Sequence, residues 1–189
     1  MRKEKINIAK TGLEFHYALS GPGAATARYV AGGVESEFEL SNVCNPLGDM
    51  LSALAHLITH PSQLWEGSNT AAFVWYSEQE SYNWTLSVDR EGHMSVRVTQ
   101  TNEFFGDDEV ELVSHECAAT DFLHCVVVEL DSFIKELGLL NYHQMWQTAE
   151  FPLTYFLILK RYLSDLGFWD EADAGRSLNL ATEIGLLLG

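Results

Sequence analysis

Lysine and arginine are scarce in this chain, and their distribution is uneven. Eleven basic residues stand against 27 acidic ones in 189 residues, which gives a formal net charge of −16. No lysine or arginine lies between Arg28 and Arg90, or between Arg97 and Lys135. Because such a field repels phosphates and attracts cations, it disfavours direct binding of nucleic acids or anionic membranes and favours a basic protein partner. Acidity that serves solubility alone is the alternative interpretation.

Long apolar runs and paired cysteines are also missing. The most apolar stretch, residues 151–159, is far shorter than the roughly 20 residues that span a bilayer, and the amino-terminal residues lack the apolar core of a secretory signal. Cys44, Cys117 and Cys125 have no repeated spacing, which is typical of reduced and buried thiols. We therefore expect a single cytoplasmic domain over residues 1–189, long enough to form a hydrophobic core.

No complete catalytic or metal-binding signature occurs in the sequence. His56 and His60 have a metal-ligand spacing, but the glutamate of the metalloprotease motif is absent, and helix capping is favoured. The acids of 107–111 do not match a calcium-binding loop. A further group lacks the paired spacing of zinc ligands and comprises His115, Cys117, His124 and Cys125. We predict no catalytic residue, metal or cofactor, although a cysteine–histidine pair assembled in space stays open.

Hydrophobic periodicity predicts an α+β domain, with antiparallel sheets and packed helices. Alternation predicts strands over 5–20, 29–43, 71–77, 82–88, 93–99 and 110–117. Spacings of three and four predict helices over 46–60, 120–137 and 152–166, and a short helix within 177–189. Leu166 is expected on the inward face of its helix. We interpret 20–28 as turn material, the glycines at 32 and 33 as a bulge or kink, and 138–151 as irregular.

The turn after residue 89 can be interpreted in detail. Pairing Val88 with Met94 places the apolar residues of both strands on one face. This register requires a three-residue loop, 90–92, whose last position favours a left-handed conformation, and Gly92 occupies that position. Asn45 likewise predicts the start of the helix that follows it, because asparagine is a favoured N-cap.

Acidic side chains gather where the predicted strands and turns expose them. In VESEFELSN, residues 34–42, three glutamates form one row on the outer face of a strand, and the sequence places no lysine or arginine near them. Trp75 and Tyr76 point to opposite faces of their strand, so an aromatic side chain is expected at the surface beside an acidic turn, as in a binding hot spot. The predicted partner-binding residues are Glu35, Glu37, Glu39, Glu78, Glu80, Asp107, Asp108, Glu109 and Glu111.

Two segments carry a family resemblance. LSNVCNPLGDMLSALAHL (40–57) and FVWYSEQESYNWTL (73–86) resemble small bacterial immunity proteins of polymorphic-toxin and contact-dependent growth inhibition systems. The shared pattern joins a strand, a helix beginning at Asn45-Pro46-Leu47, a glutamate-bearing turn and the Trp84-Thr85-Leu86 strand, over about a third of the chain. The resemblance implies a non-catalytic cytoplasmic protein that binds and neutralises one toxin domain, in particular an EndoU-type ribonuclease toxin. It also implies a fold like that of Whirly domains.

Three functions follow from these observations. The first is immunity to a basic toxin, which predicts a toxin gene directly upstream. The second is an acidic regulatory or structural subunit of another complex, which predicts partners unrelated to toxins. The third is an enzyme whose residues assemble only in space, which predicts a cleft that gathers histidine, cysteine and acids with shifted pKa values. The sequence favours the first.

Overall fold

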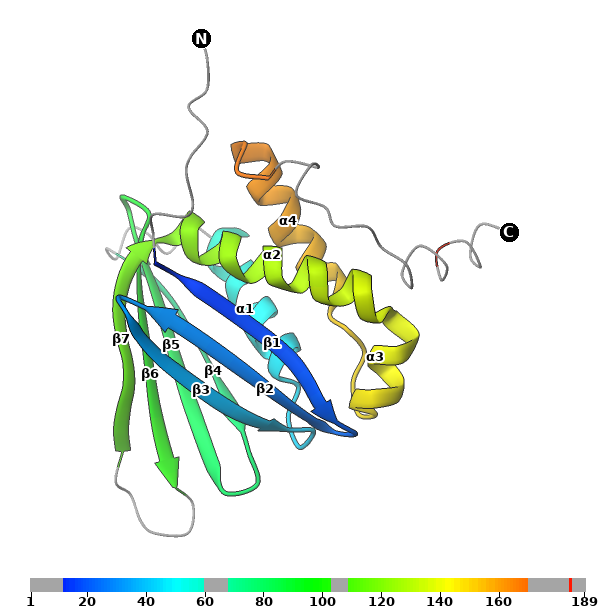
Figure 1. Ribbon diagram of the computed structural model, residues 1–189. Coiled ribbons are helices and arrows are strands. Elements are labelled where there is room, and N and C mark those ends of the chain that lie inside the picture. Colours follow the sequence, from blue (N-terminus) through cyan, green and yellow to red (C-terminus); the bar gives the residue numbers. More distant parts are fainter. Residues whose placement is uncertain (1–11, 60–67, 103–108, 170–183, 185–189) are drawn as a thin grey trace.

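The computed structural model describes residues 12–59, 68–102, 109–169 and 184. In these residues the order is three strands, one helix, four strands and three helices (Figure 1). The strands are β1 (Glu14–Gly21), β2 (Ala24–Ala31), β3 (Val34–Ser41), β4 (Ser68–Tyr76), β5 (Glu80–Asp89), β6 (His93–Asn102) and β7 (Glu109–Ala118). The helices are α1 (Pro46–Thr59), α2 (Ala119–Leu137), α3 (Leu139–Trp146) and α4 (Leu153–Leu166).

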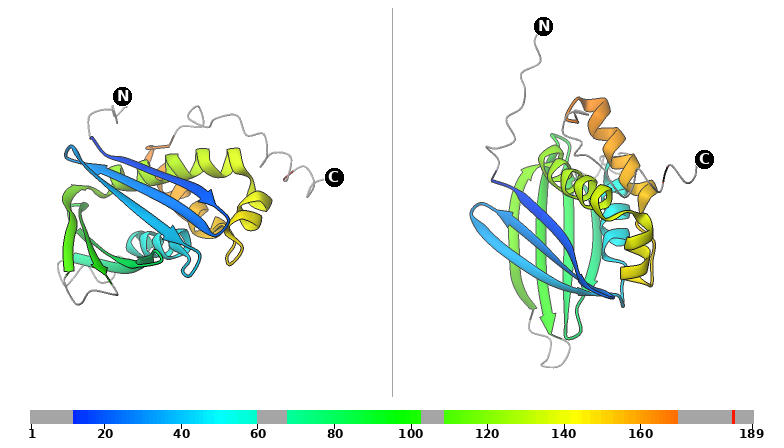
Figure 2. Two further views of the ribbon diagram at one scale, coloured as in Figure 1. Left: turned by 60° about the horizontal axis from the view of Figure 1, so that its bottom comes forward. Right: turned by 45° about the vertical axis from the view of Figure 1, so that its right-hand side comes forward.

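The strands form two antiparallel sheets, so the predicted α+β class is confirmed. The first sheet has the order β1-β2-β3 and the second the order β4-β5-β6-β7. In Figures 1 and 2 the first sheet lies across one face of the second. The predicted register of the β5–β6 hairpin is also confirmed, since Val88 pairs with Met94 and Trp84 with Val98.

Aromatic side chains fill the space between the sheets. The ring of Phe38 on β3 lies 5.8 Å from that of Trp75, 5.1 Å from that of Tyr82 and 5.2 Å from that of Trp84. All four side chains are buried. Edge-to-face and tilted contacts of this kind add to the free energy gained by burial, so this cluster fixes where β3 crosses the second sheet.

Helix α1 begins as predicted and lies along β4. The Asn45 side chain accepts a hydrogen bond from a first-turn N–H at 3.1 Å. The Trp75 indole donates to the Pro46 carbonyl at 2.9 Å, and the Asn69 amide donates to the Leu57 carbonyl at 3.2 Å. These two bonds fix α1 against β4 near both of its ends.

Helix α2 covers the outer edge of β1. The backbone N–H of Tyr17 donates to Glu129 Oε1 at 3.1 Å, so the helix satisfies a donor that an edge strand would otherwise expose. The first turn of α2 has no side-chain cap, but the N–H of Ala119 donates to the Gly92 carbonyl at 2.9 Å. Gly138 ends the helix at a φ of 84°, as the sequence predicts.

A buried carboxylate joins α4 to α2. Asp131 is only 3% exposed, and its two oxygens accept the ammonium groups of Lys135 and Lys160, each at 2.5 Å. The Lys160 ammonium also lies 4.6 Å from the centre of the Trp169 ring. The two ion pairs offset the free-energy cost of burying the Asp131 carboxylate between the two helices.

Two predictions for the amino-terminal strands are wrong. β2 begins at Ala24, within the segment interpreted as turn material, because small residues at 25 and 27 pack on the inner face of a central strand. The glycines at 32 and 33 do not kink a strand. They form the two-residue turn of the β2–β3 hairpin, with φ values of 58° and 82°, and glycine adopts such values without steric cost.

Two predictions for the carboxyl-terminal half are also wrong. Residues 139–146, expected to be irregular, form α3, which follows α2 directly and buries Tyr142 and Trp146. Leu166 was expected to face inward but is 47% exposed, because α4 ends there and only Phe156, Leu159 and Leu163 are buried. The helix expected within 177–189 and the strand expected over residues 5–11 fall largely outside the described residues.

The Gly92 turn allows a direct test of the hairpin. Gly92 has a φ of +85°, and a Cβ added there would meet no atom within 4 Å, so substitution acts through the backbone rather than through a clash. We expect Gly92→Val to lower the free energy of unfolding by about 1–3 kcal/mol, because a β-branched residue is strained at positive φ. Urea unfolding measures the change. Gly92→Asn should lose less, because asparagine tolerates this conformation. A Val variant as stable as the wild type would contradict the explanation.

Asp131 provides a test of the helix packing. We expect Asp131→Asn to lower the free energy of unfolding by about 3–5 kcal/mol, because it removes the buried carboxylate that two partly buried lysines share. Asp165→Asn is the matched control, since its ion pair with Arg161 is exposed and should contribute no more than about 1 kcal/mol. Equal stability of the two variants in urea would show that Asp131 does not hold the helices together.

Candidate functional site

Strand β3 spans the whole width of the second sheet. Near its start, Ser36 Oγ donates to the Leu112 carbonyl on β7 at 3.3 Å. At its end, Ser41 Oγ donates to the Tyr76 carbonyl on β4 at 3.3 Å. Because β4 and β7 are the two edge strands of that sheet, β3 crosses it from one edge to the other (Figure 1).

The predicted acidic residues do not all share one face. Glu37 and Glu39 alternate with the buried Phe38 and Leu40 and face away from the second sheet, whereas Glu111 pairs with Arg97, which lies between the buried Val96 and Val98 and faces away from the first sheet. Glu80 pairs with Asn102 and Glu109 with Thr101, so both glutamates lie at the same end of the second sheet. Asp107 and Asp108 lie outside the described residues. We call the remaining set the acidic rim, and it comprises Glu35, Glu37, Glu39, Glu78, Glu80, Glu109 and Glu111.

The glutamate row on β3 is exposed as predicted, but it has a cation beside it. Arg28 on β2 stands opposite Glu37, and its guanidinium lies 3.5 Å from Glu35 and 3.6 Å from Glu14. The expectation that no lysine or arginine lies near the row is therefore wrong in space. The sequence does not indicate that Arg28 is a neighbour of the row, because pairing across the β2–β3 hairpin brings together residues that are separated along the chain.

At the other end of the row, both sheets contact one phenol. Tyr82 donates from its hydroxyl to Glu80 Oε2 at 2.9 Å. Burial, then this hydrogen bond and the charge of Glu80, raise the pKa of Tyr82, while a hydrogen bond with the Glu39 backbone partly opposes the rise. The Glu39 backbone from the first sheet and the Glu80 carboxylate from the second thus meet at the Tyr82 hydroxyl, which stays protonated and donating at neutral pH.

Much of the rim's negative charge is not neutralised within the protein. Arg97 pairs with Glu111 at 2.8 Å, and both side chains are about half exposed. In the part of the chain that the structure describes, Glu37, Glu39 and Glu78 form no ion pair within 4.0 Å. The rim can therefore attract a basic partner, since exposed carboxylates without internal counter-ions contribute fully to the surface potential.

The other candidate ligands lie on two different elements. His115 and Cys117 lie on β7, while His124 and Cys125 lie on α2. They are not among the described residues whose ligand atoms gather closely enough to hold a metal. Burial raises the pKa of Cys117 to about 11 and that of Cys125 further, so neither thiol ionises at neutral pH. His56 is exposed on α1, and His60 lies outside the described residues.

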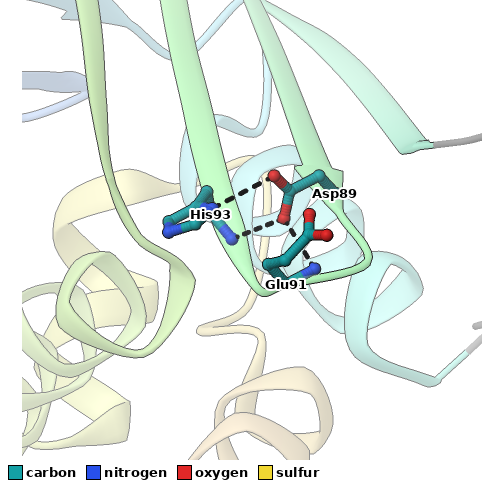
Figure 3. Close-up of side chains that lie close together, drawn as sticks. All are labelled: Asp89, Glu91 and His93. Atoms are coloured by element: carbon teal, nitrogen blue, oxygen red, sulfur yellow. Dashed lines mark hydrogen bonds and ion pairs between the residues drawn. The ribbon is translucent and has the colours of Figure 1, made fainter.

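One cluster with metal-ligating groups was not predicted. Asp89, Glu91 and His93 surround the β5–β6 turn with ligand atoms within 4.8 Å of one another (Figure 3). The carboxylate of Asp89 already accepts the backbone N–H groups of Glu91 at 3.0 Å and His93 at 2.8 Å, and it lies 3.1 Å from His93 Nδ1. These bonds account for the cluster as a turn-stabilising arrangement. The sequence indicates this cluster by placing two acids and a histidine at alternate positions around the hairpin turn.

Comparisons with protein-family models, curated proteins and solved structures found no match to this chain. The resemblance to immunity proteins and to Whirly domains therefore stays a prediction. None of the described helices is both long and apolar enough to cross a bilayer.

Asp89 gives a prediction for the dependence of stability on pH. The His93 backbone N–H, first among its contacts, lowers the pKa of Asp89 in the folded protein. A carboxyl group whose pKa is lowered by folding stabilises the protein at pH values above its unfolded-state pKa of about 3.9. This stabilisation is lost as the pH falls through the pKa of the folded state. We expect Asp89→Ala to lower the melting temperature at pH 7, and the difference from wild type to shrink towards pH 3. Glu91→Ala is the control, and the same pH trend in both variants would contradict the assignment.

Proposed function

We propose that this chain is an immunity protein that binds and neutralises a cognate toxin domain, a basic nuclease, through the acidic rim. The observation that carries the proposal is the exposure of Glu37, Glu39 and Glu78, none of which forms an ion pair with another described residue. The family resemblance of residues 40–57 and 73–86 supports the same function. A nuclease and its inhibitor would meet in the cytoplasm, where the substrate lies.

The chemistry of nucleases supports an acidic inhibitor. A nuclease binds the phosphate backbone with lysine and arginine, so its cleft carries a positive potential. Carboxylates that face this cleft compete with phosphate for the same cations, and complementary potentials accelerate encounter. Strands and a short turn hold the described carboxylates of the rim, so its backbone needs little ordering on binding.

The test is the kinetics of binding to the toxin encoded by the adjacent gene. We expect the double substitution Glu37→Gln, Glu39→Gln to slow association several-fold at low ionic strength and to weaken its salt dependence. The dissociation rate should change less, because these side chains lie at an exposed rim. The free energy of unfolding should stay within about 0.5 kcal/mol of wild type, as is usual for exposed positions.

A matched control removes two charges elsewhere. Glu116 on β7 and Asp165 on α4 are exposed, and neither belongs to the rim. The double variant Glu116→Gln, Asp165→Asn has the same net charge as the rim variant, so it isolates the effect of position. If both variants slow association equally, net charge alone governs the encounter and the rim is not the binding surface. If the adjacent gene's product does not bind at all, the proposed function is wrong.

A further inference from the structure

A groove runs along α1, between β4 and α4. It encloses about 910 Å³ and is lined by one side of α1, by β4 and by Tyr155 and Ile158 of α4. A second hollow of about 540 Å³ continues past the first turn of α1 and shares Asp49 and Tyr155 with the first. The right-hand view of Figure 2 shows α1 between the second sheet and α4.

The groove exposes the free edge of a sheet. Within the described chain, β4 is paired with β5 alone, so one side of its backbone has no neighbouring strand. The consecutive residues 70–74 all line the groove, whereas a strand that presented only one face would contribute alternate residues. The unpaired backbone side of β4 therefore borders the groove, and such an edge can accept a further strand.

Large apolar side chains stand exposed on both walls. Tyr76 at the end of β4 is 36% exposed, Tyr155 on α4 is 42% exposed and Ile158 is 36% exposed. Leu153, at the start of α4, lines the second hollow and is 37% exposed. Aromatic residues around a hollow are the composition of protein-binding hot spots. The exposed aromatic expected beside the acidic turn is Tyr76.

The groove also carries one unbalanced charge. Asp49 lines both hollows, and no lysine or arginine is among the described residues that line either of them. Burial raises the pKa of Asp49, while a hydrogen bond from the Asn45 backbone opposes the rise. In the described part of the chain Asp49 forms no ion pair within 4.0 Å. A cationic group placed in the groove would therefore stabilise the ionised carboxylate.

We infer that this groove receives an extended, cationic segment of a protein partner, which pairs with the free edge of β4. A lysine or arginine of the segment contacts Asp49, and apolar residues contact Tyr76 and Tyr155. The inference rests on the proposed function in one respect only, which is that the segment belongs to the toxin. The groove adjoins the acidic rim, because Tyr76 precedes the turn that contains Glu78.

The experiment selects ligands without using the toxin. A display library of short random peptides is selected against the full-length protein, against Asp49→Lys and against the control Asp165→Lys, each first shown to be folded by circular dichroism. We expect the wild type and the control to enrich peptides with alternating apolar residues and one lysine or arginine. Asp49→Lys should instead enrich an acidic residue at that position. Tyr155→Ala should weaken the best wild-type peptide about ten-fold, as loss of a hot-spot aromatic does.

Amide hydrogen exchange then locates the bound peptide. We expect the best wild-type peptide to slow the exchange of β4 amides and to leave the edge of β7 unchanged. Selected peptides that lack a common basic position, or that are the same for wild type and Asp49→Lys, would overturn the inference. Protection of β4 by concentration-dependent dimerisation would also overturn it, because the occupant would be a second copy. Failure of toxin binding alone would refute the proposed function and leave the peptide result intact.

Discussion

The position of Phe38 constrains the rest of the structure. Its ring packs on Trp75, Tyr82 and Trp84 of the second sheet, so β3 must cross that sheet with residues 38 and 40 facing inward. Since side chains alternate along a strand, Glu37 and Glu39 must then face solvent. The acidic row is therefore a consequence of core packing. What the sequence adds is the choice of glutamate at positions where any polar residue would satisfy the fold.

The scarcity of cations makes their placement informative. Lys135 and Lys160 both bind Asp131, which leaves two positive charges on one buried carboxylate. Arg28 is shared between Glu14 and Glu35 on the outer face of the first sheet. Lys160 thus holds α4 on α2, and Lys135 binds the same carboxylate from within α2, while among the described residues Glu37, Glu39 and Glu78 of the rim form no ion pair.

Local rules explain what could be predicted from the sequence. The α1 start and the β5–β6 turn were correct because Asn45 and Gly92 act through a capping bond and a backbone conformation that depend on near neighbours. The β2–β3 turn was missed because paired glycines suit both a bulge and a hairpin, and only the pairing partner decides between them. α3 was missed because its stability depends on burying Tyr142 and Trp146 against distant residues rather than on a long apolar stripe.

The two proposed binding surfaces differ in the same way in how far the sequence predicts them. The glutamate row could be predicted because strand alternation places it, but its neighbour Arg28 depends on the register between β2 and β3. The groove could not be predicted at all. The groove exists because α4 packs on α1 at a distance from the edge of β4. Local sequence patterns predict neither how helices pack nor the order of strands in a sheet.

The rim and the groove suit different stages of one binding event. Charges on the rim act over a screening length of about 8 Å at physiological ionic strength, so they guide a basic partner before contact but distinguish poorly among basic proteins. In the proposed complex, backbone pairing at β4 and contacts with Tyr155 would act only at close range and would set how long the complex lasts. Because Tyr76 and Glu78 lie two residues apart, a partner guided by the rim arrives beside the groove. Specificity for one toxin among many basic proteins would then reside in the groove.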